Sequence, residues 1–235
     1  MITRLTALAS CVFVVGYVLA AILFRSNGKK IRRDPLETKI LMWIPLFLIC
    51  LLFVTSDDVL RSFIVLWVLW HAFGEILRQK QAKTIMLRTS YLLLISGGVI
   101  CAVLLVHMDR SIFLAVWLAS VMSDVTAFFL GNYRGKHRLP RQLNSRKSWE
   151  GVGGQFIGAW AGVLLLNQFV TPIPAYLAIT VGCGSAAGDL LNSYVKRRLD
   201  IHDWGNSIPG HGGYLDRFSS LSLALLLSYV GLRTI

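Results

Sequence analysis

Long apolar runs alternate with short basic stretches along this chain of 235 residues. A run of about 20 apolar residues can cross the roughly 30 Å hydrocarbon core of a bilayer as a helix. The pattern predicts helices at approximately residues 5–24, 40–55, 59–77, 89–107, 111–131, 150–167, 175–195 and 219–233. The predicted fold is therefore all-α, a polytopic membrane protein with about eight transmembrane helices, of which the second and the last are short.

The charges favour a membrane-inserted chain over one that binds nucleic acid. Hydrophobic residues make up 55% of the sequence and charged residues 15%, against roughly 25% charged residues in ordinary soluble domains. Of the 24 Lys and Arg residues, 20 lie in four alternate loops, at 25–39, 78–88, 132–149 and 196–218. The positive-inside rule places these loops in the cytoplasm and the N-terminus outside. The net charge of +12 is thus explained without a nucleic-acid partner.

The chain is predicted to form one membrane domain with two parts of different content. Residues 1–110 form hydrophobic helices joined by basic loops, whereas residues 111–235 hold most of the polar residues that suggest chemistry. The first apolar run is interpreted as a retained helix, because its core is long for a signal peptide and a basic stretch follows it. The cysteines lie in apolar runs, which indicates buried thiols rather than disulfides or a zinc site.

Acidic residues inside apolar helices are costly to insert into a membrane and are usually functional. Asp124 and Asp189 are the two that stand out here. Glu75 lies near the predicted cytoplasmic end of the third helix. Its spacing favours a structural acid paired with Arg78 or Lys80 over a functional one.

Asp189 begins a polar stripe on its predicted helix. Asn192, Ser193, Lys196 and Arg197 follow it at intervals of three, four, seven and eight residues, which places all of them on one helical face. A single acid would fit a polar contact between helices. A stripe that combines a carboxylate, a hydroxyl and two cations fits a binding site better.

A glycine-rich turn, Pro-Gly-His-Gly-Gly, precedes Asp216 and Arg217. Gly212 and Gly213 let the backbone approach a ligand closely, and successive N–H groups in such turns bind anions. His211 adds a donor or a titratable group, and Arg217 can hold a phosphate bidentately. Carboxylates from two separate segments beside phosphate donors suit Mg²⁺, which takes oxygen ligands and is usually shared with substrate phosphates.

The basic loop that follows the fifth predicted helix ends in Lys-Ser-Trp-Glu-Gly. Lys147 and Ser148 lie at the start of the next helix, where free N–H groups and the helix dipole favour an anion. Six cations alone would fit an ordinary cytoplasmic loop, but the glycines after Ser148 favour substrate binding. Such a site suits a polyphosphate from the cytoplasm and a second substrate in the leaflet.

These residues resemble the phosphatidate cytidylyltransferase family, the CDP-diacylglycerol synthases. The family motif reads approximately S-x-x-K-R-x-x-x-x-K-D-x-x-x-x-x-P-G-H-G-G-x-x-D-R-x-D, and residues 193–219 read SYVKRRLDIHDWGNSIPGHGGYLDRFS. The matching positions are Ser193, Lys196, Arg197, Asp203, Pro209, Gly210, His211, Gly212, Gly213, Asp216 and Arg217. The upstream family pattern is echoed by SDVTAFFLGNYRGK and NSRKSWEG, so the resemblance covers roughly residues 120–222.

The resemblance implies a membrane-bound enzyme of phospholipid biosynthesis that converts CTP and phosphatidate, or a related lipid phosphate, to CDP-diacylglycerol and diphosphate. It implies Mg²⁺, with room for a second cation, and Asp189 and Asp216 as its ligands. Further residues expected to act in catalysis or substrate binding are Lys196, Arg197, Asp124, Lys147, Ser148, Ser193, His211, Gly212, Gly213 and Arg217. A homodimer in a bacterial inner membrane, with the site facing the cytoplasm, is also implied.

Two positions of the motif at 193–219 differ in the chain, where His202 replaces a Lys and Ser219 replaces an Asp; upstream, Asn144-Ser145 replaces Ser-Pro and Ser148 replaces a Thr. The first two differences favour, as an alternative, a non-catalytic homologue that binds lipid or serves as a partner subunit. A CTP-dependent lipid kinase is a second alternative, which would release CDP rather than diphosphate. A transporter would explain the helices and their acids but not the glycine-rich turn.

Overall fold

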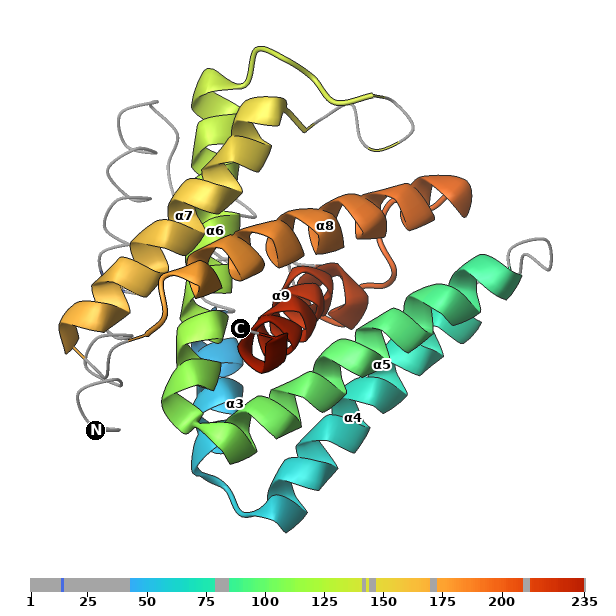
Figure 1. The fold of residues 1–235 in the computed structure, drawn as a ribbon. Coiled ribbons are helices and arrows are strands. Elements are labelled where there is room, and N and C mark those ends of the chain that lie inside the picture. The colour runs from blue at the N-terminus through green and yellow to red at the C-terminus, as the bar shows by residue number, and fades with distance from the viewer. Residues whose placement is uncertain are drawn as a thin grey trace.

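The computed structural model describes residues 14, 43–78, 85–140, 143, 147–169, 173–208 and 212–234, and these ranges are helical apart from turns and isolated β-bridges. The helices are α3 (Trp43–Thr55), α4 (Asp58–Leu77), α5 (Ile85–Met108), α6 (Arg110–Arg134), α7 (Trp149–Phe169), α8 (Tyr176–Arg198) and α9 (Tyr214–Thr234) (Figure 1). The predicted all-α fold is confirmed.

Every predicted helix except the first, which lies outside the described residues, coincides with a helix of the structure. Among the described helices, α4, α5, α6 and α9 are long and apolar enough to cross a membrane, so this is a membrane protein. The 13 residues of α3 extend only about 20 Å at 1.5 Å per residue. The predicted number of about eight spans is not confirmed, because α7 and α8 are long enough but less apolar.

The last helix, α9, lies in the middle of the helix bundle, between α8 on one side and α5 on the other (Figure 1). It also packs against α6 and α4, while α6 and α7 form the most extensive helix pair. The core between these helices is apolar, and its fully buried residues include Leu105, Val116, Leu177 and Ala224. Polar residues near the N-terminus of α9 are therefore surrounded by several helices.

Helices α6 and α7 approach closely because one face of α7 carries glycine at every fourth position: Gly154, Gly158 and Gly162. A Cβ atom at Gly158 would lie 2.3 Å from the carbonyl oxygen of Met122, and one at Gly162 would lie 2.6 Å from the Cα atom of Ala119. Such faces are typical of membrane helices, which associate through close packing because lipid already solvates apolar side chains.

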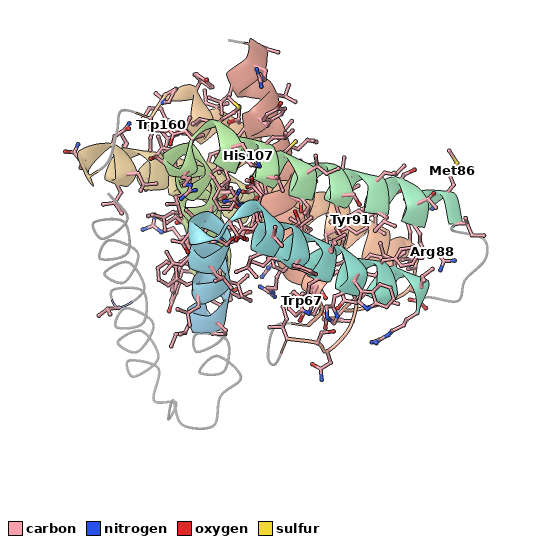
Figure 2. The ribbon with its side chains drawn as sticks, turned by 90° about the horizontal axis from the view of Figure 1, so that it is seen from below. Trp67, Met86, Arg88, Tyr91, His107 and Trp160 are labelled. Carbon is pink, nitrogen blue, oxygen red and sulfur yellow. The ribbon has the colours of Figure 1, made fainter. Side chains whose placement is uncertain are left out.

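Apolar side chains cover the outer face of α4, where Phe63 is 64% exposed and Trp70 is 74% exposed. Figure 2 shows α4 beside α5, with Trp67 extending from α4 and Met86 from the outer end of α5. On the opposite side of α4, Glu75 is buried. This arrangement fits a helix with lipid on its outer face and the polar site on its inner face.

The substitution Gly158→Ala is expected to lower the thermal unfolding midpoint in detergent, because its methyl group would force α6 and α7 apart. Overpacking of this kind costs about 1–3 kcal/mol. The matched control is Gly153→Ala on the same helix, where an added Cβ meets nothing within 4 Å and the midpoint should stay the same or rise. Equal midpoints for the two variants would contradict the close α6–α7 contact.

Candidate functional site

Asp216 lies in the first turn of α9, and its side chain is only 4% exposed. Its Oδ1 accepts a hydrogen bond from Lys196 Nζ on α8 at 2.6 Å. Its Oδ2 accepts hydrogen bonds from the backbone N–H groups of Trp204 and Gly213, both at 2.9 Å. The carboxylate therefore joins α8, the loop that follows α8 and the beginning of α9.

The glycine-rich turn is folded against the Asp216 carboxylate. Gly212 has a φ of 82°, and a Cβ atom there would lie 2.8 Å from Asp216 Oδ2, so both backbone conformation and space require glycine. The turn is closed by a hydrogen bond of 2.9 Å from Ile208 N to Gly212 O. Residues 209–211 lie outside the described part of the chain, and the role predicted for His211 stays a prediction.

A buried network fixes the loop between α8 and α9 from behind. Asn192 Oδ1 accepts hydrogen bonds from the Tyr91 hydroxyl at 2.9 Å and from Trp204 Nε1 at 2.7 Å. The Tyr91 and Trp204 rings stack with their centroids 5.5 Å apart and an angle of 9° between their planes. Since the Trp204 backbone N–H donates to Asp216, this network helps to place the carboxylate.

Asp189 lies on α8 and pairs with Lys147, which comes from the basic loop before α7. Lys147 Nζ contacts Asp189 Oδ1 and also donates to the Asp189 carbonyl oxygen at 3.3 Å. The Lys147 side chain is 29% exposed and the Asp189 side chain is 34% exposed. Asp189 is thus held by a cation but remains open to a ligand.

The contact between α8 and α9 places the middle of α8, which carries Asp189, beside the first turns of α9, which carry Asp216. A Cβ atom at Gly188 would lie 2.4 Å from the carbonyl oxygen of Ser219, so the backbones touch beside Asp189. Ser219 lies about one helical turn after Asp216. Each of the two carboxylates has a lysine of its own as a neighbour.

The beginning of α7 uses Ser148 as a helix cap. Ser148 is buried, and its Oγ accepts a hydrogen bond from Gly151 N at 3.2 Å, the usual N-cap interaction. Glu150 accepts a hydrogen bond from His137 Nδ1 at 2.6 Å, and hydrogen bonds from its own backbone N–H and from His137 lower the pKa of Glu150 to about 2. The basic loop is therefore fastened to α7, and phosphate binding by Ser148 stays a prediction.

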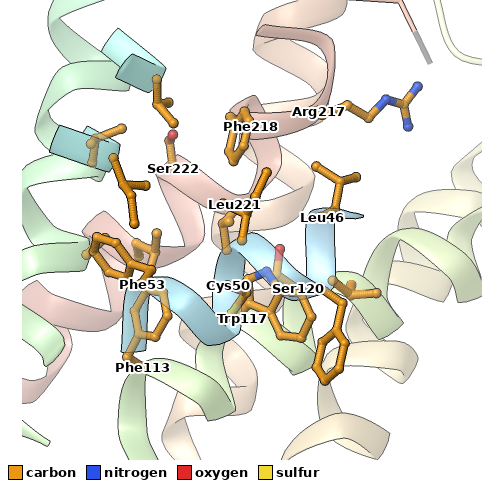
Figure 3. Close-up of a pocket in the computed structure, with 18 of the residues that line it drawn as sticks. Leu46, Cys50, Phe53, Phe113, Trp117, Ser120, Arg217, Phe218, Leu221 and Ser222 are labelled. Carbon is orange, nitrogen blue, oxygen red and sulfur yellow. The ribbon is translucent and has the colours of Figure 1, made fainter. Parts of the chain in front are cut away.

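Asp124 on α6 faces an apolar cavity of about 220 Å³ between α3, α4, α5, α6 and α9. Figure 3 shows rings of Phe113 and Trp117 among the lining, with Arg217 at its edge. Asp124 is exposed and is one of the residues that line the cavity. It lies within electrostatic range of Asp189, Arg217 and Lys147, so the cavity has a polar end near the Lys147–Asp189 pair.

The polar stripe predicted on α8 is divided among different neighbours. Asp189 faces Lys147, whereas Asn192 and Lys196 hold the loop after α8 and the first turn of α9. Ser193 is buried, and exposed Arg197 makes a long contact of 3.5 Å with a backbone carbonyl oxygen. These contacts do not show a single ligand shared by all members of the stripe, and its role as one binding site stays a prediction.

The two carboxylates suit a metal ion that is shared with a substrate. Among the residues that the structure describes, no group of three or more His, Cys, Asp or Glu side chains could hold a metal ion. Mg²⁺ commonly needs only one or two carboxylates, because waters and substrate phosphates complete its shell. Asp189 and Asp216 offer such oxygen donors, and a bound cation would share them with Lys147 and Lys196 or displace these lysines.

Sequence reasoning singled out Glu75 as a structural acid but did not find its partners. Glu75 accepts hydrogen bonds from Ser207 and from the backbone of Tyr214 and Leu215, rather than pairing with Arg78 as predicted. Lys80, the other predicted partner, lies outside the described residues. A buried acid next to a glycine-rich turn can be recognised only once both are placed in space.

The substitution Asn192→Leu is expected to lower the unfolding midpoint in detergent, because it leaves the Tyr91 hydroxyl and Trp204 Nε1 buried without their acceptor. Each such loss costs about 1–3 kcal/mol. The matched variant Tyr91→Phe removes one donor while Trp204 still occupies the Asn192 oxygen, so a smaller decrease is expected. An Asn192→Leu midpoint equal to that of the unmodified protein would contradict the network.

Comparison with known proteins identifies the family to which the chain belongs. The family model described as the cytidylyltransferase family matches residues 1–235. The chain is 34% identical over 117 residues to a phosphatidate cytidylyltransferase of Mycobacterium bovis, which covers 48% of this chain and 38% of that protein. It is 36% identical over 124 residues to one of Brucella abortus, which covers 51% of this chain and 44% of that protein. The matched segments span less than half of these relatives, but the family model spans the whole chain, and this protein belongs to the cytidylyltransferase family.

Proposed function

We propose that this protein is a phosphatidate cytidylyltransferase, which transfers the cytidylyl group of CTP to phosphatidate or a related lipid phosphate and releases diphosphate. The observation that carries the proposal is the position of the two lysine–carboxylate pairs, Lys147–Asp189 and Lys196–Asp216. The first pair lies within electrostatic range of Asp124, and Asp216 directly precedes Arg217; both Asp124 and Arg217 line the apolar cavity. The names of the relatives in Mycobacterium and Brucella support the same activity.

The cavity supports a lipid as one of the substrates. Its wall is made by aromatic and aliphatic side chains of membrane helices, including Phe47, Phe53 and Leu221. An acyl chain could leave the bilayer for such a site at little cost, because both environments are apolar. The phosphate of the same lipid would then lie near Arg217, whose guanidinium group suits a phosphate.

The reaction requires no strong general base. A phosphate monoester has a second pKa near 6 and is already largely dianionic at neutral pH. One of its oxygens forms a bond to the α-phosphorus of CTP, while the bond from that phosphorus to the bridging oxygen breaks. The bridging oxygen leaves with its electron pair as part of diphosphate. The barrier comes from bringing two polyanions together, so positioning and charge stabilisation supply most of the catalysis.

The cationic residues of the site suit this task. Lys147 and Lys196 already face the site and are held by carboxylates, so each can exchange a carboxylate for a substrate phosphate without crossing the molecule. Arg217 would hold the lipid phosphate, with Arg197 and Ser193 at the margin of the site. Mg²⁺ held by Asp189 and Asp216, with room for a second cation, would supply charge to the departing diphosphate oxygens.

The distribution of basic residues also bears on where the site lies relative to the membrane. The basic loop that carries Lys147 and the basic last turn of α8 that carries Lys196 belong on the cytoplasmic side by the positive-inside rule, where CTP is available. We assign the protein to the inner membrane of a bacterium, as a homodimer, with its site facing the cytoplasm.

The direct test is an assay of the purified protein with labelled CTP, Mg²⁺ and a panel of lipid phosphates. Formation of CDP-lipid and diphosphate is expected, and removal of Mg²⁺ with a chelator should abolish it. Asp189→Asn and Asp216→Asn should each lower turnover by about 100-fold or more, since outer-shell partners of a metal alone cost 10–100-fold. The control Asp57→Asn changes an N-cap of α4 to an equally good one and should retain activity.

Three outcomes would contradict this proposal. Release of CDP with a phosphorylated lipid would identify a lipid kinase. Absence of both turnover and binding of Mg²⁺–CTP would identify a non-catalytic homologue. Full turnover in both Asp189→Asn and Asp216→Asn, in protein that remains folded, would remove the two carboxylates from the mechanism.

Lys147→Ala is expected to raise the KM for CTP by about tenfold, which corresponds to the loss of roughly 1.4 kcal/mol of binding. The reason is that a phosphate loses one charged donor. Lys136→Ala provides the control, because Lys136 is an exposed cation of the same loop and tests the effect of net charge alone. A KM that rises equally in both variants would assign the effect to the loop's general charge rather than to Lys147.

A further inference from the structure

Glu75 is a buried acid that is not part of the reaction described above. It lies on the inner face of α4 and is 2% exposed. Its Oε1 accepts hydrogen bonds from Tyr214 N at 2.9 Å and Ser207 Oγ at 3.0 Å, and its Oε2 accepts one from Leu215 N at 3.0 Å. Tyr214 and Leu215 are 139 and 140 residues away along the chain. Glu75 therefore links α4 directly to the beginning of α9.

The negative charge of a buried carboxylate needs hydrogen-bond donors, and the backbone N–H groups at the N-terminus of α9 provide them. Tyr214 and Leu215 are the first two residues of α9, and the first N–H groups of a helix have no acceptor within that helix. The positive end of the helix dipole also favours an anion at this position. Glu75 thus caps α9 from another helix, a role that a residue before a helix normally fills from its own segment.

The fit between Glu75 and the glycine-rich turn is close. A Cβ atom at Gly213 would lie 2.5 Å from Glu75 Oε2, and one at Gly205 would lie 3.2 Å from Glu75 Oε1. Glycine at 213 is therefore explained by the approach of this carboxylate. The Glu75 carboxylate accepts hydrogen bonds from both sides of the glycine-rich turn: from Ser207 before the turn and from the first residues of α9 after it.

We propose that Glu75 is a positioning residue that aims Asp216 and Arg217 by fixing the first turn of α9. This inference rests on the proposed function, in which Asp216 holds the metal ion and Arg217 a phosphate. Leu215 donates a backbone hydrogen bond to Glu75, and Asp216 is the next residue. Any rotation of this turn therefore moves the Asp216 carboxylate. A misplacement of about 1 Å can lower catalysis by about 100-fold.

The chemistry requires a carboxylate rather than an amide at this position. Glutamine has almost the same size, but at one of its two terminal atoms it would present an NH₂ group to backbone N–H groups. Two donors would then face each other in a buried site, and at least one N–H group of α9 would lose its acceptor. Glu75→Gln therefore perturbs the first turn of α9 without creating a cavity.

The test compares Glu75→Gln with Asp57→Asn, the same change of acid to amide at the opposite end of α4. For Glu75→Gln, the Mg²⁺ concentration that gives half-maximal CDP-lipid formation should rise by about tenfold or more, as for residues that support a metal ligand. The kcat should fall, and the KM for the lipid should rise as well, because Arg217 lies on the same perturbed turn. Asp57→Asn should match the unmodified protein. A kcat that falls only with the folded fraction, at an unchanged Mg²⁺ midpoint, would overturn the proposal.

A second measurement does not depend on activity. Hydrogen–deuterium exchange of the amides of Tyr214 and Leu215 should become faster in Glu75→Gln, whereas amides in the middle of α9 should exchange as before. If the unmodified protein forms no CDP-lipid, the proposed function fails, and this exchange experiment still decides whether Glu75 fixes the turn. Unchanged exchange at both amides would overturn the inference by itself.

If Glu75→Gln does not fold, Ser207→Ala provides a milder variant. Of the three hydrogen bonds that described residues donate to the Glu75 carboxylate, it removes one and leaves the two from α9. A smaller rise of the Mg²⁺ midpoint, with slightly faster exchange at Tyr214, is expected. Values identical to those of the unmodified protein would contradict the role of Glu75.

Discussion

The buried ion pair between Lys196 and Asp216 is the interaction on which the rest of the site depends. The carboxylate of Asp216 is compensated by one cation and by the N–H groups of Trp204 and Gly213. Removing one partner of such a pair strands the other charge, which typically costs about 3–5 kcal/mol. The pair thereby fixes the end of α8, the loop after it and the start of α9 relative to one another.

Two kinds of contact hold the helices together, and they occupy different parts of the molecule. Close packing at small residues joins α6 to α7, for example at Gly158, and joins α8 to α9 at Gly188. Polar contacts gather at the end of the bundle where Glu75, Asn192 and Asp216 each accept hydrogen bonds from other segments. In an apolar medium both kinds stabilise association without hydrophobic burial.

The helices were predictable from the sequence because membrane insertion imposes a simple pattern of apolar length and basic loops. The acids Asp124, Asp189 and Asp216 were also recognisable, because a carboxylate in such a sequence has few structural roles. Their partners were not predictable, since the pairing of Lys147 with Asp189 depends on how a loop crosses to another helix. The same is true of Glu75, whose partners are backbone N–H groups that every residue carries.

The structure also constrains the order in which the molecule can assemble. Glu75 belongs to α4, but the donors that the described residues offer to its oxygens lie in the loop and helix that the chain adds about 130–140 residues later. Contacts so distant in sequence form slowly, because the chain must close a long loop first. Until α9 docks, the Glu75 carboxylate on α4 lacks these hydrogen bonds. Docking of α9 therefore completes the folding of α4 as well as the site.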